Sequence, residues 1–282
     1  MSDKLDIIIL MNALDMGGAE KQSLLLAKAI GNDYRVHYVV QKNEPRLKQH
    51  LDFIERERIN YVQLSGSFLA RLWQLRSYVR QNDVRLLIAM LTLDNAMAAC
   101  ISLLTGIKCI GGVRSSYLPF QKLFVTWIAE KFFLDHIIYN NNYGRNLFVK
   151  KGFSGRKSSV IHNCINNIQK EIKRPRREKI TILSVGRFTF EKDYLTALKA
   201  ISILNKICSD KVIDYIIIGD GECLDLINGW VNNLKLGNVS LVINPESVEA
   251  FYITADIYLM SSISEGMPNS VMEAFSYSLP VV

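Results

Sequence analysis

The sequence predicts an α/β protein made of two doubly wound, Rossmann-like domains. Short apolar segments alternate with helix-periodic segments along nearly all of the 282 residues, which is typical of βαβ units around a parallel sheet. Glycine-rich turns follow several of the apolar segments, where ligands bind in open α/β sheets. A basic run that contains a proline, residues 173–179, interrupts the alternation. We therefore expect a first domain at 1–166, a linker at 167–179 and a second domain at 180–282.

The first domain opens with a strand at 6–10, a turn at Gly17 and Gly18, and a helix that reaches Ile30. The two glycines let the backbone approach a ligand, or they form no more than a tight turn. Strand and helix patterns then alternate to the end of the domain. The expected strands lie at 35–40, 61–64, 84–90, 108–113, 137–140 and 159–161, and the expected helices at 46–58, 68–81, 95–104, 117–134 and 143–150.

The helix expected at 117–134 is apolar well beyond one stripe of its surface. A helix of that kind is usually buried, so we expect it to pack in the core. The alternative is a helix at a membrane interface, because Phe and Trp side chains flanked by Lys122 and Lys131 are favoured there.

The second domain begins with a strand and continues the alternation to a last helix, which Ser270 opens. Before that helix, an apolar strand runs into a loop broken by Gly266, Pro268 and Asn269. The free amides and the dipole at a helix start favour an anionic ligand. The expected strands lie at 180–185, 215–218, 239–243 and 255–260, and the expected helices at 194–207, at 247–254 and from 270 onward.

The composition is that of an ordinary globular protein, with 49% apolar and 22% charged residues. The N-terminus does not resemble a signal peptide, and no run approaches the ~18 apolar residues that would span a bilayer. Five scattered cysteines favour reduced thiols in a cytosolic protein, and four histidines without ligand spacing predict no metal site. We expect a cytoplasmic protein, in solution or on a membrane surface.

Charge is divided unevenly along the chain. Residues 1–172 carry 23 Lys and Arg against 14 Asp and Glu, a net charge of +9, and residues 173–179 carry +4. Residues 180–282 carry −6. A basic first half predicts contact with a membrane surface, a lipid phosphate or nucleic acid. The run at 173–179 is better explained as a solvated linker than as a nucleic-acid patch, because it contains a proline and lies between domains. We therefore expect no nucleic-acid partner.

Two glutamates, Glu265 and Glu273, bracket the loop in the second domain. A carboxylate repels phosphate, so we expect both to accept hydrogen bonds from the hydroxyl groups of a sugar or a ribose. For Glu273 a structural role is the alternative, because Ser270 to Glu273 fits a capping box. Gly219 and Gly221 form another turn after a strand, and its backbone would frame a nucleotide.

Positive side chains follow strand ends at two places. Gly186 and Arg187 end one strand, and Lys192 precedes the next helix, an arrangement that suits a diphosphate. Arg114 follows a strand of the first domain, where its guanidinium would hold an anionic group. A local ion pair is the structural alternative at both places.

The segment that carries both glutamates, D-I-Y-L-x-x-S-x-S-E-G-x-P-N-S-x-x-E-A, resembles the E-x7-E signature of glycosyltransferase family 4. G-G-A-E at 17–20, V-G-R-F-x-x-x-K-D at 185–193 and the glycine turn at 219–221 also resemble segments of that family, in the same order. The segment at 162–166 matches the family's P-N-G-[IV]-D only in part, and Asp193 stands where glycine is usual. The resemblance implies the GT-B architecture, with two Rossmann-like domains.

The resemblance also implies roles for single residues. Arg187 and Lys192 would stabilise a leaving diphosphate, Glu265 would orient the donor sugar as the third catalytic residue, and Glu273 would hold the ribose. It implies no metal and no cofactor, since a nucleotide sugar, expected to be a UDP-sugar, is the substrate. The implied donor-binding residues are Gly186, Gly219, Gly221, Gly266, Met267, Pro268, Asn269 and Glu273, and the implied acceptor residues are Gly17, Gly18, Arg114 and Asn163.

The implied function is metal-independent sugar transfer, with retained anomeric configuration, to a lipid-linked glycan acceptor. The basic first domain suits such an acceptor and contact with an anionic membrane at its cytoplasmic face, as in the assembly of lipopolysaccharide or capsule. Residues 280–282 look like the start of a new strand, so the resemblance implies that the second domain is incomplete and truncated at its C-terminus. The alternatives are a nucleotide-sugar epimerase on the same scaffold and an inactive truncated remnant that binds a nucleotide.

Overall fold

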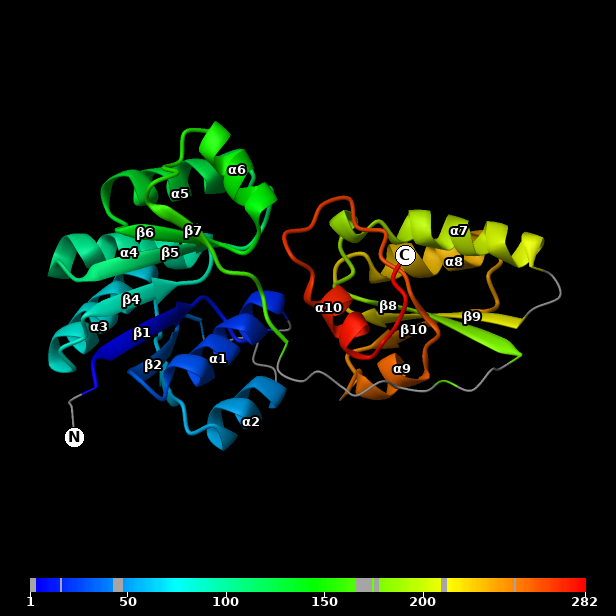
Figure 1. The fold of residues 1–282 in the computed structure, drawn as a ribbon, viewed down its shortest axis with the longest axis horizontal. Helices are drawn as coiled ribbons and strands as arrows, with labels where there is room; N and C mark the ends of the chain where they lie inside the picture. The colour runs from blue at the N-terminus through cyan, green and yellow to red at the C-terminus, as the bar shows by residue number, and fades with distance from the viewer. Residues whose placement is uncertain are drawn as a thin grey trace. The chain divides into compact units, whose positions relative to one another are not determined.

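The computed structural model describes residues 4–15, 17–42, 48–165, 174, 178–208, 212–245 and 247–282. They divide into two compact units, Met1–Cys164 (unit 1) and Ile165–Val282 (unit 2). Each unit is built from helices layered on a parallel sheet (Figure 1). The predicted α/β class with two Rossmann-like domains is confirmed. Most of the predicted linker, and the start of the helix predicted at 46–58, lie outside the described residues.

The sheet of unit 1 has the strand order β3-β2-β1-β4-β5-β6-β7, and all of its pairs are parallel. This is the order of a doubly wound fold, which reverses between β1 and β4. The strands are β1 (Asp6–Met11), β2 (Arg35–Val40), β3 (Asn60–Gln63), β4 (Leu86–Ala89), β5 (Lys108–Val113), β6 (His136–Tyr139) and β7 (Ser158–Val160). The helices are α1 (Gly18–Ile30), α2 (Lys48–Arg56), α3 (Phe68–Gln81), α4 (Thr92–Thr105), α5 (Phe120–Phe132) and α6 (Asn142–Lys150).

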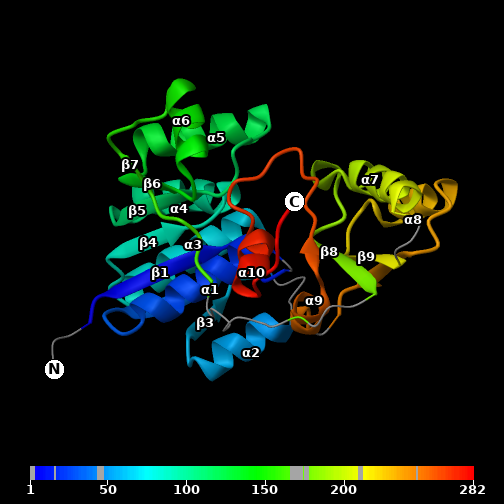
Figure 2. The same cartoon turned by 45° about the vertical axis from the view of Figure 1, so that its right-hand side comes forward.

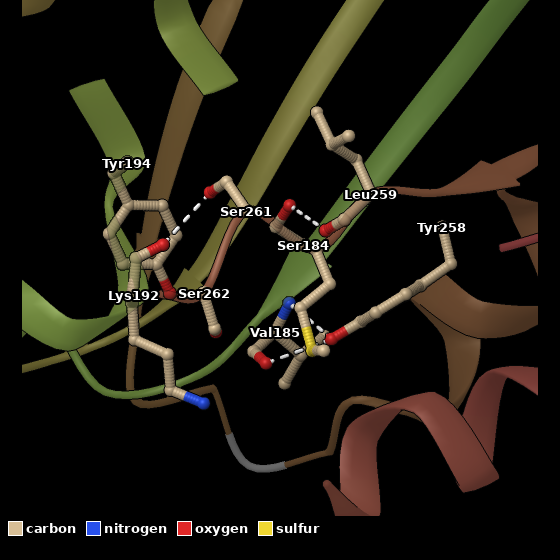
Figure 3. Close-up of a pocket in the computed structure, with 9 residues that line it drawn as sticks. Ser184, Val185, Lys192, Tyr194, Tyr258, Leu259, Ser261 and Ser262 are labelled. Carbon is tan, nitrogen blue, oxygen red and sulfur yellow. Dashed lines mark hydrogen bonds between the residues drawn. The ribbon is translucent and has the colours of Figure 1, made fainter. Parts of the chain in front are cut away.

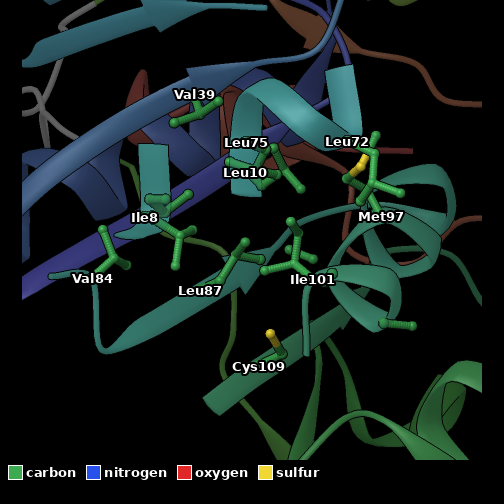
Figure 4. Packing of buried hydrophobic residues seen from close by; sticks show 14 of the residues in the cluster. Ile8, Leu10, Val39, Leu72, Leu75, Val84, Leu87, Met97, Ile101 and Cys109 are labelled. Carbon is green, nitrogen blue, oxygen red and sulfur yellow. The ribbon is translucent and has the colours of Figure 1, made fainter. Parts of the chain in front are cut away.

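Strand β1 lies between two helical layers and is buried on both faces. Ile8 and Leu10 pack with α3 and α4, as Figure 4 shows. Ile9 and Met11 point the other way and pack with α1 and α2. All four side chains are completely buried. The uninterrupted apolar run of this strand is therefore explained by its central place in a parallel sheet covered on both faces.

Unit 2 has a parallel sheet of order β10-β9-β8-β11, which reverses between β8 and β11. Helices α7 and α8 cover one face of this sheet, and α9 lies on the other (Figures 1 and 2). The strands are β8 (Lys179–Val185), β9 (Val212–Gly219), β10 (Val239–Ile243) and β11 (Ile257–Tyr258). The helices are the 3-10 turn η1 (Phe190–Lys192), α7 (Tyr194–Ile207), α8 (Leu224–Asn233), α9 (Glu249–Thr254) and α10 (Asn269–Ser276).

Several elements of unit 2 differ from the prediction, among them α8 and β11. Helix α8 was not predicted, since one glycine and three asparagines lower its helix propensity. It forms because Ile227 and Trp230 pack on the sheet beneath it. Strand β11 contains two of the six predicted strand residues, because Ala255 instead ends α9 as its C-cap.

Helix α5 does not pack as predicted. Its buried residues are Thr126, Ala129 and Glu130, whereas Phe120, Phe124 and Phe132 are 79%, 52% and 66% exposed. The prediction that this helix lies in the core is wrong, because its fully buried positions carry small and polar residues and three of its phenylalanines are exposed. No helix in the described part of the chain has both the length and the apolar character needed to cross a membrane.

Candidate functional site

A small pocket opens in unit 2 at the carboxyl ends of β8 and β11, where the strand order reverses (Figure 3). Ligands bind at this position in doubly wound folds. The end of β8 forms one wall, and the segment that follows β11 forms another. The pocket is lined by Ser184, Val185, Lys192, Tyr194, Tyr258, Leu259, Met260, Ser261 and Ser262.

Hydroxyl groups make up much of the polar lining. The Tyr194 hydroxyl donates to the Gly186 carbonyl at 3.0 Å, and the Tyr258 hydroxyl donates to the Val185 carbonyl at 3.0 Å. Burial raises the pKa of Tyr258 to about 12, so this hydroxyl stays protonated at neutral pH. The buried Ser262 hydroxyl has no hydrogen-bond partner among the described residues. A buried hydroxyl without a partner is costly, and a polar ligand would satisfy it.

Lys192 and Glu265 lie 73 positions apart in the sequence and meet at this pocket. Lys192 Nζ donates to Glu265 Oε1 at 2.6 Å, and the two side chains are 20% and 25% exposed. Ser261 Oγ donates to the Lys192 carbonyl at 2.8 Å (Figure 3). The Ile263 amide donates to the Glu191 carbonyl at 2.8 Å. The loops after β8 and β11 are therefore joined, and they present two predicted catalytic residues as one charged pair.

The loop that carries Lys192 ends in a left-handed residue. Asp193 has a φ of 45° and caps α7, since its side chain accepts a hydrogen bond from the Thr196 amide at 3.3 Å. Glycine is favoured in this backbone conformation and aspartate is tolerated, which explains how Asp193 fits where the resemblance predicts glycine. Arg187, the third predicted catalytic residue, lies earlier in this loop with an exposed side chain.

Gly219 and Gly221 let the loops after β8 and β9 pack directly on each other. A Cβ atom at Gly219 would overlap the Gly186 carbonyl oxygen. Gly221 has a φ of 149°, and a Cβ atom there would lie 2.6 Å from the Phe188 carbonyl oxygen. Loop packing therefore requires both glycines, and their role toward a nucleotide remains a prediction.

Glu273 lies inside α10 and is not part of a capping box. The helix begins at Asn269 with Pro268 as its N-cap, so Ser270 is already the second helical residue. The capping-box explanation for Glu273 is therefore wrong. Instead, Glu273 Oε2 accepts a hydrogen bond from the Tyr252 hydroxyl at 3.1 Å. The other predicted loop residues, Gly266, Met267, Pro268 and Asn269, are partly exposed between Glu265 and Ser270.

The predicted acceptor residues lie in unit 1, and the structure joins two of them. Arg114 Nη1 donates to Asn163 Oδ1 at 2.9 Å. Burial lowers the pKa of the Arg114 guanidinium to about 10, which still leaves it charged at neutral pH. Gly17 is the N-cap of α1, and a Cβ atom there would overlap the Glu20 carboxylate, which folds back over the turn. Gly18 is exposed at the first position of α1.

The hydroxyl groups of this site were not predicted. Tyr194 and Tyr258 lie in apolar segments that indicate only a helix and a strand, and their hydroxyls gain a role from the loops that surround them. The bond between Tyr252 and Glu273 was not predictable either, because the position of Tyr252 on the apolar face of α9 predicts only that its side chain is buried. Within the described ranges, no three His, Cys, Asp or Glu side chains are grouped so as to hold a metal ion.

Two family descriptions match the chain. Glycosyltransferase Family 4 matches residues 16–167, and Glycosyl transferases group 1 matches residues 166–282. An uncharacterized glycosyltransferase of Haemophilus influenzae is 23% identical over 281 residues, which cover 97% of this chain and 78% of that protein. An uncharacterized glycosyltransferase of Methanocaldococcus jannaschii is 28% identical over 117 residues, which cover 41% of this chain and 28% of that protein.

Other similar proteins have more specific names. A Campylobacter jejuni protein, named a GalNAc-alpha-(1->4)-GalNAc-alpha-(1->3)-diNAcBac-PP-undecaprenol alpha-1,4-N-acetyl-D-galactosaminyltransferase, is 22% identical over 97% of this chain and 77% of its own length. Among solved structures, Anabaena Alr3699/HepE in complex with UDP-glucose has a TM-score of 0.82 at 15% identity, over 98% of this chain and 79% of that one. This structural likeness supports the fold.

Proposed function

The chain belongs to glycosyltransferase family 4, and on that premise we propose that it transfers a sugar from a nucleotide-sugar donor to a glycan acceptor. The observation that carries the proposal is the Lys192–Glu265 pair at the pocket of unit 2. The pair combines a cation for phosphate with an acceptor for sugar hydroxyls. It lies where a doubly wound sheet binds nucleotides.

In this proposal the donor is a UDP-sugar held in unit 2. Lys192 and the exposed Arg187 neutralise the diphosphate, whose charge grows as the bond to the anomeric carbon breaks. No metal or cofactor is required for that step, because the two cations supply the charge. Glu265 accepts hydrogen bonds from the sugar, and the amides at the start of α10 face its phosphate.

The nucleoside is held by Glu273, whose carboxylate accepts hydrogen bonds from ribose hydroxyls. The Tyr252 hydroxyl donates to Glu273 Oε2 at 3.1 Å and so fixes the direction of the carboxylate. Gly186, Gly219 and Gly221 keep the loop backbone close to the nucleotide. The UDP-glucose bound in the Anabaena structure supports a nucleotide sugar as the class of donor.

The proposed acceptor is a lipid-linked saccharide. In the product, the transferred sugar keeps the anomeric configuration that it had in the donor. Two observations support this class of acceptor. Residues 1–172 carry a net charge of +9, which suits a lipid diphosphate. The name of the Campylobacter protein describes an undecaprenol-diphosphate acceptor. Arg114 and its partner Asn163 form the cationic group of unit 1 that we assign to the acceptor, with Gly17 and Gly18. The process would be surface-polysaccharide assembly.

We also propose that helix α5 contacts an anionic membrane at its cytoplasmic face. Phe120, Phe124 and Trp127 form a stacked row, with ring centroids 6.4 Å apart at each step. The exposed Lys122 and Lys131 lie on the same helix. Residues 117–157 carry seven Lys and Arg against two Asp and Glu. Exposed aromatic rings among cations are the composition of an interfacial helix.

Vesicle flotation tests this contact. We expect the chain to float with vesicles that contain phosphatidylglycerol and not with neutral phosphatidylcholine vesicles. Phe120→Ser with Phe124→Ser should abolish flotation. Ile203→Ser with Ile207→Ser, which removes an exposed apolar pair from α7, should leave it unchanged. Equal flotation of both double variants would contradict the assignment.

Turnover tests the proposed reaction. The chain is incubated with UDP-hexoses and UDP-N-acetylhexosamines and with diphosphate-linked lipid glycans, with and without EDTA. We expect one donor to give a glycosylated lipid that retains the donor's anomeric configuration, unaffected by EDTA and lost in Lys192→Ala. An epimerised nucleotide sugar formed without acceptor would indicate an epimerase. No turnover by a chain that binds the nucleotide would indicate an inactive remnant.

A further inference from the structure

All three guanidinium nitrogens of Arg174 donate hydrogen bonds to carbonyl groups of unit 2. Its Nε donates to the Ala255 carbonyl at 2.7 Å, and its Nη1 donates to the Ser278 carbonyl at 3.2 Å. Its Nη2 donates to the Tyr252 carbonyl at 3.1 Å and to the Tyr277 carbonyl at 2.7 Å. The expectation that this run is a solvated linker is therefore wrong at Arg174, which is partly buried and bonded to four carbonyl groups.

The four carbonyl groups come from the ends of two helices. Tyr252 and Ala255 lie in the last turn and at the C-cap of α9, and Tyr277 and Ser278 lie at the C-cap of α10 and just beyond it. Carbonyl groups at helix ends lack partners within the helix and carry the negative end of the dipole. The Arg174 guanidinium therefore binds the carbonyl groups at the ends of both helices and holds α9 against α10.

The same two helices hold Glu273. The rings of Tyr252 and Tyr277 are stacked, with centroids 5.3 Å apart and an interplanar angle of 4°. Tyr252 is bonded to Arg174 through its carbonyl and to Glu273 Oε2 through its hydroxyl. A continuous set of contacts thus leads from the guanidinium, through Tyr252, to the carboxylate that we assign to the ribose.

We propose that Arg174 is a positioning residue for the nucleotide site: it fixes α9 against α10 so that Tyr252 holds Glu273 at the ribose. The inference rests on the proposed function, because it needs Glu273 to bind a nucleotide. The planar fork of arginine is essential, since its five N–H donors have fixed directions and can serve four carbonyls at once. Lysine keeps the charge but lacks that fork.

A double-mutant cycle on UDP binding, measured by isothermal titration, tests the inference. The variants are Arg174→Lys, Glu273→Ala and the two combined, with Lys199→Ala as a control that removes an exposed charge from α7. We expect Arg174→Lys to weaken UDP binding about fivefold, as for the loss of one good hydrogen bond. It should cause no further loss in the Glu273→Ala background. The control should bind like the wild type.

A purely structural role gives a different result. Arg174→Lys would then lower the melting temperature while the folded chain kept wild-type affinity for UDP. Alternatively, its loss of UDP affinity would add fully to the loss caused by Glu273→Ala. Either outcome overturns the inference. Tyr252→Phe, which removes only the hydroxyl, provides a second test if Arg174→Lys does not fold, and it too should bind about fivefold more weakly. Wild-type affinity in Tyr252→Phe would also contradict the inference. Failure of the wild-type chain to bind any nucleoside diphosphate would overturn the proposed function as well.

Discussion

Replacing Glu265 by glutamine should strengthen the binding of UDP while weakening sugar transfer. Lys192 Nζ lies 2.6 Å from Glu265 Oε1 when no ligand is bound, so a diphosphate has to compete with that carboxylate for the ammonium group. Glu265→Gln keeps the size of the side chain and removes the competing charge. Transfer should become slower, because the sugar loses its anionic hydrogen-bond acceptor.

The magnitude follows from the exposure of the pair. Two unit charges 4 Å apart interact by about 1 kcal/mol in water and about 4 kcal/mol at an effective dielectric constant of 20. With side chains 20% and 25% exposed, the Lys192–Glu265 pair lies between these limits. Side-chain entropy and screening reduce the net value to about 1 to 2 kcal/mol. Since 1.4 kcal/mol is a factor of ten, UDP should bind about tenfold more tightly to Glu265→Gln.

Isothermal titration of UDP provides the measurement, at constant ionic strength because the pair is screened by salt. Glu249→Gln is the matched control, since it removes an exposed carboxylate of α9 that has no ion pair among the described contacts. Its affinity for UDP should stay within about twofold of the wild type. Equal or weaker binding of UDP by Glu265→Gln would refute the competition argument.

Three further variants test the energetics of the fold. Glu130→Leu should raise the free energy of unfolding by about 2 kcal/mol in urea titrations, because both Glu130 carboxylate oxygens are buried without a partner among the described residues. Burial raises the pKa of the Asp94 carboxyl well above its usual range, so from about pH 4 upward the folded chain keeps a proton that the unfolded chain has released. The free energy of unfolding of the wild type should therefore fall as pH rises above about 4. The free energy of unfolding of Asp94→Asn, relative to that of the wild type, should be higher at pH 7 than at pH 4. Gly219→Ala should lower the free energy of unfolding by about 3 kcal/mol, because the new methyl group would overlap the Gly186 carbonyl. An unchanged midpoint of urea unfolding would contradict that packing.

Elements with strong local signals were predictable from the sequence. The bounds of α3, β5 and α7 agree with the prediction to the residue. In α3, Ser67 caps the first turn through its side chain, and in α7 Asp193 does the same. Such caps fix a boundary locally, so sequence patterns suffice to find it. The alternation of strands and helices likewise predicted the α/β class correctly.

Features that depend on distant contacts were not predictable. The apolar residues of α5 predicted a core helix, yet hydrophobicity alone cannot say which side of a helix finds a partner. Arg174 lies in a run of basic residues that gives no sign of four carbonyl partners. The family resemblance assigned Lys192 and Glu265 to one donor site but did not predict their ion pair, because two loops 73 positions apart must be brought together by the sheet.

Unit 2 should bind a nucleoside diphosphate through Arg187 and Glu273. Titration of UDP, GDP, dTDP and ADP into the wild-type chain, Arg187→Ala and Glu273→Ala tests it most directly. We expect UDP to bind the wild type best and both variants to bind it at least tenfold more weakly, as for a lost charge-assisted hydrogen bond of about 1.5 to 3 kcal/mol. A folded wild-type chain that binds none of the four, or variants that bind as tightly as the wild type, would contradict it.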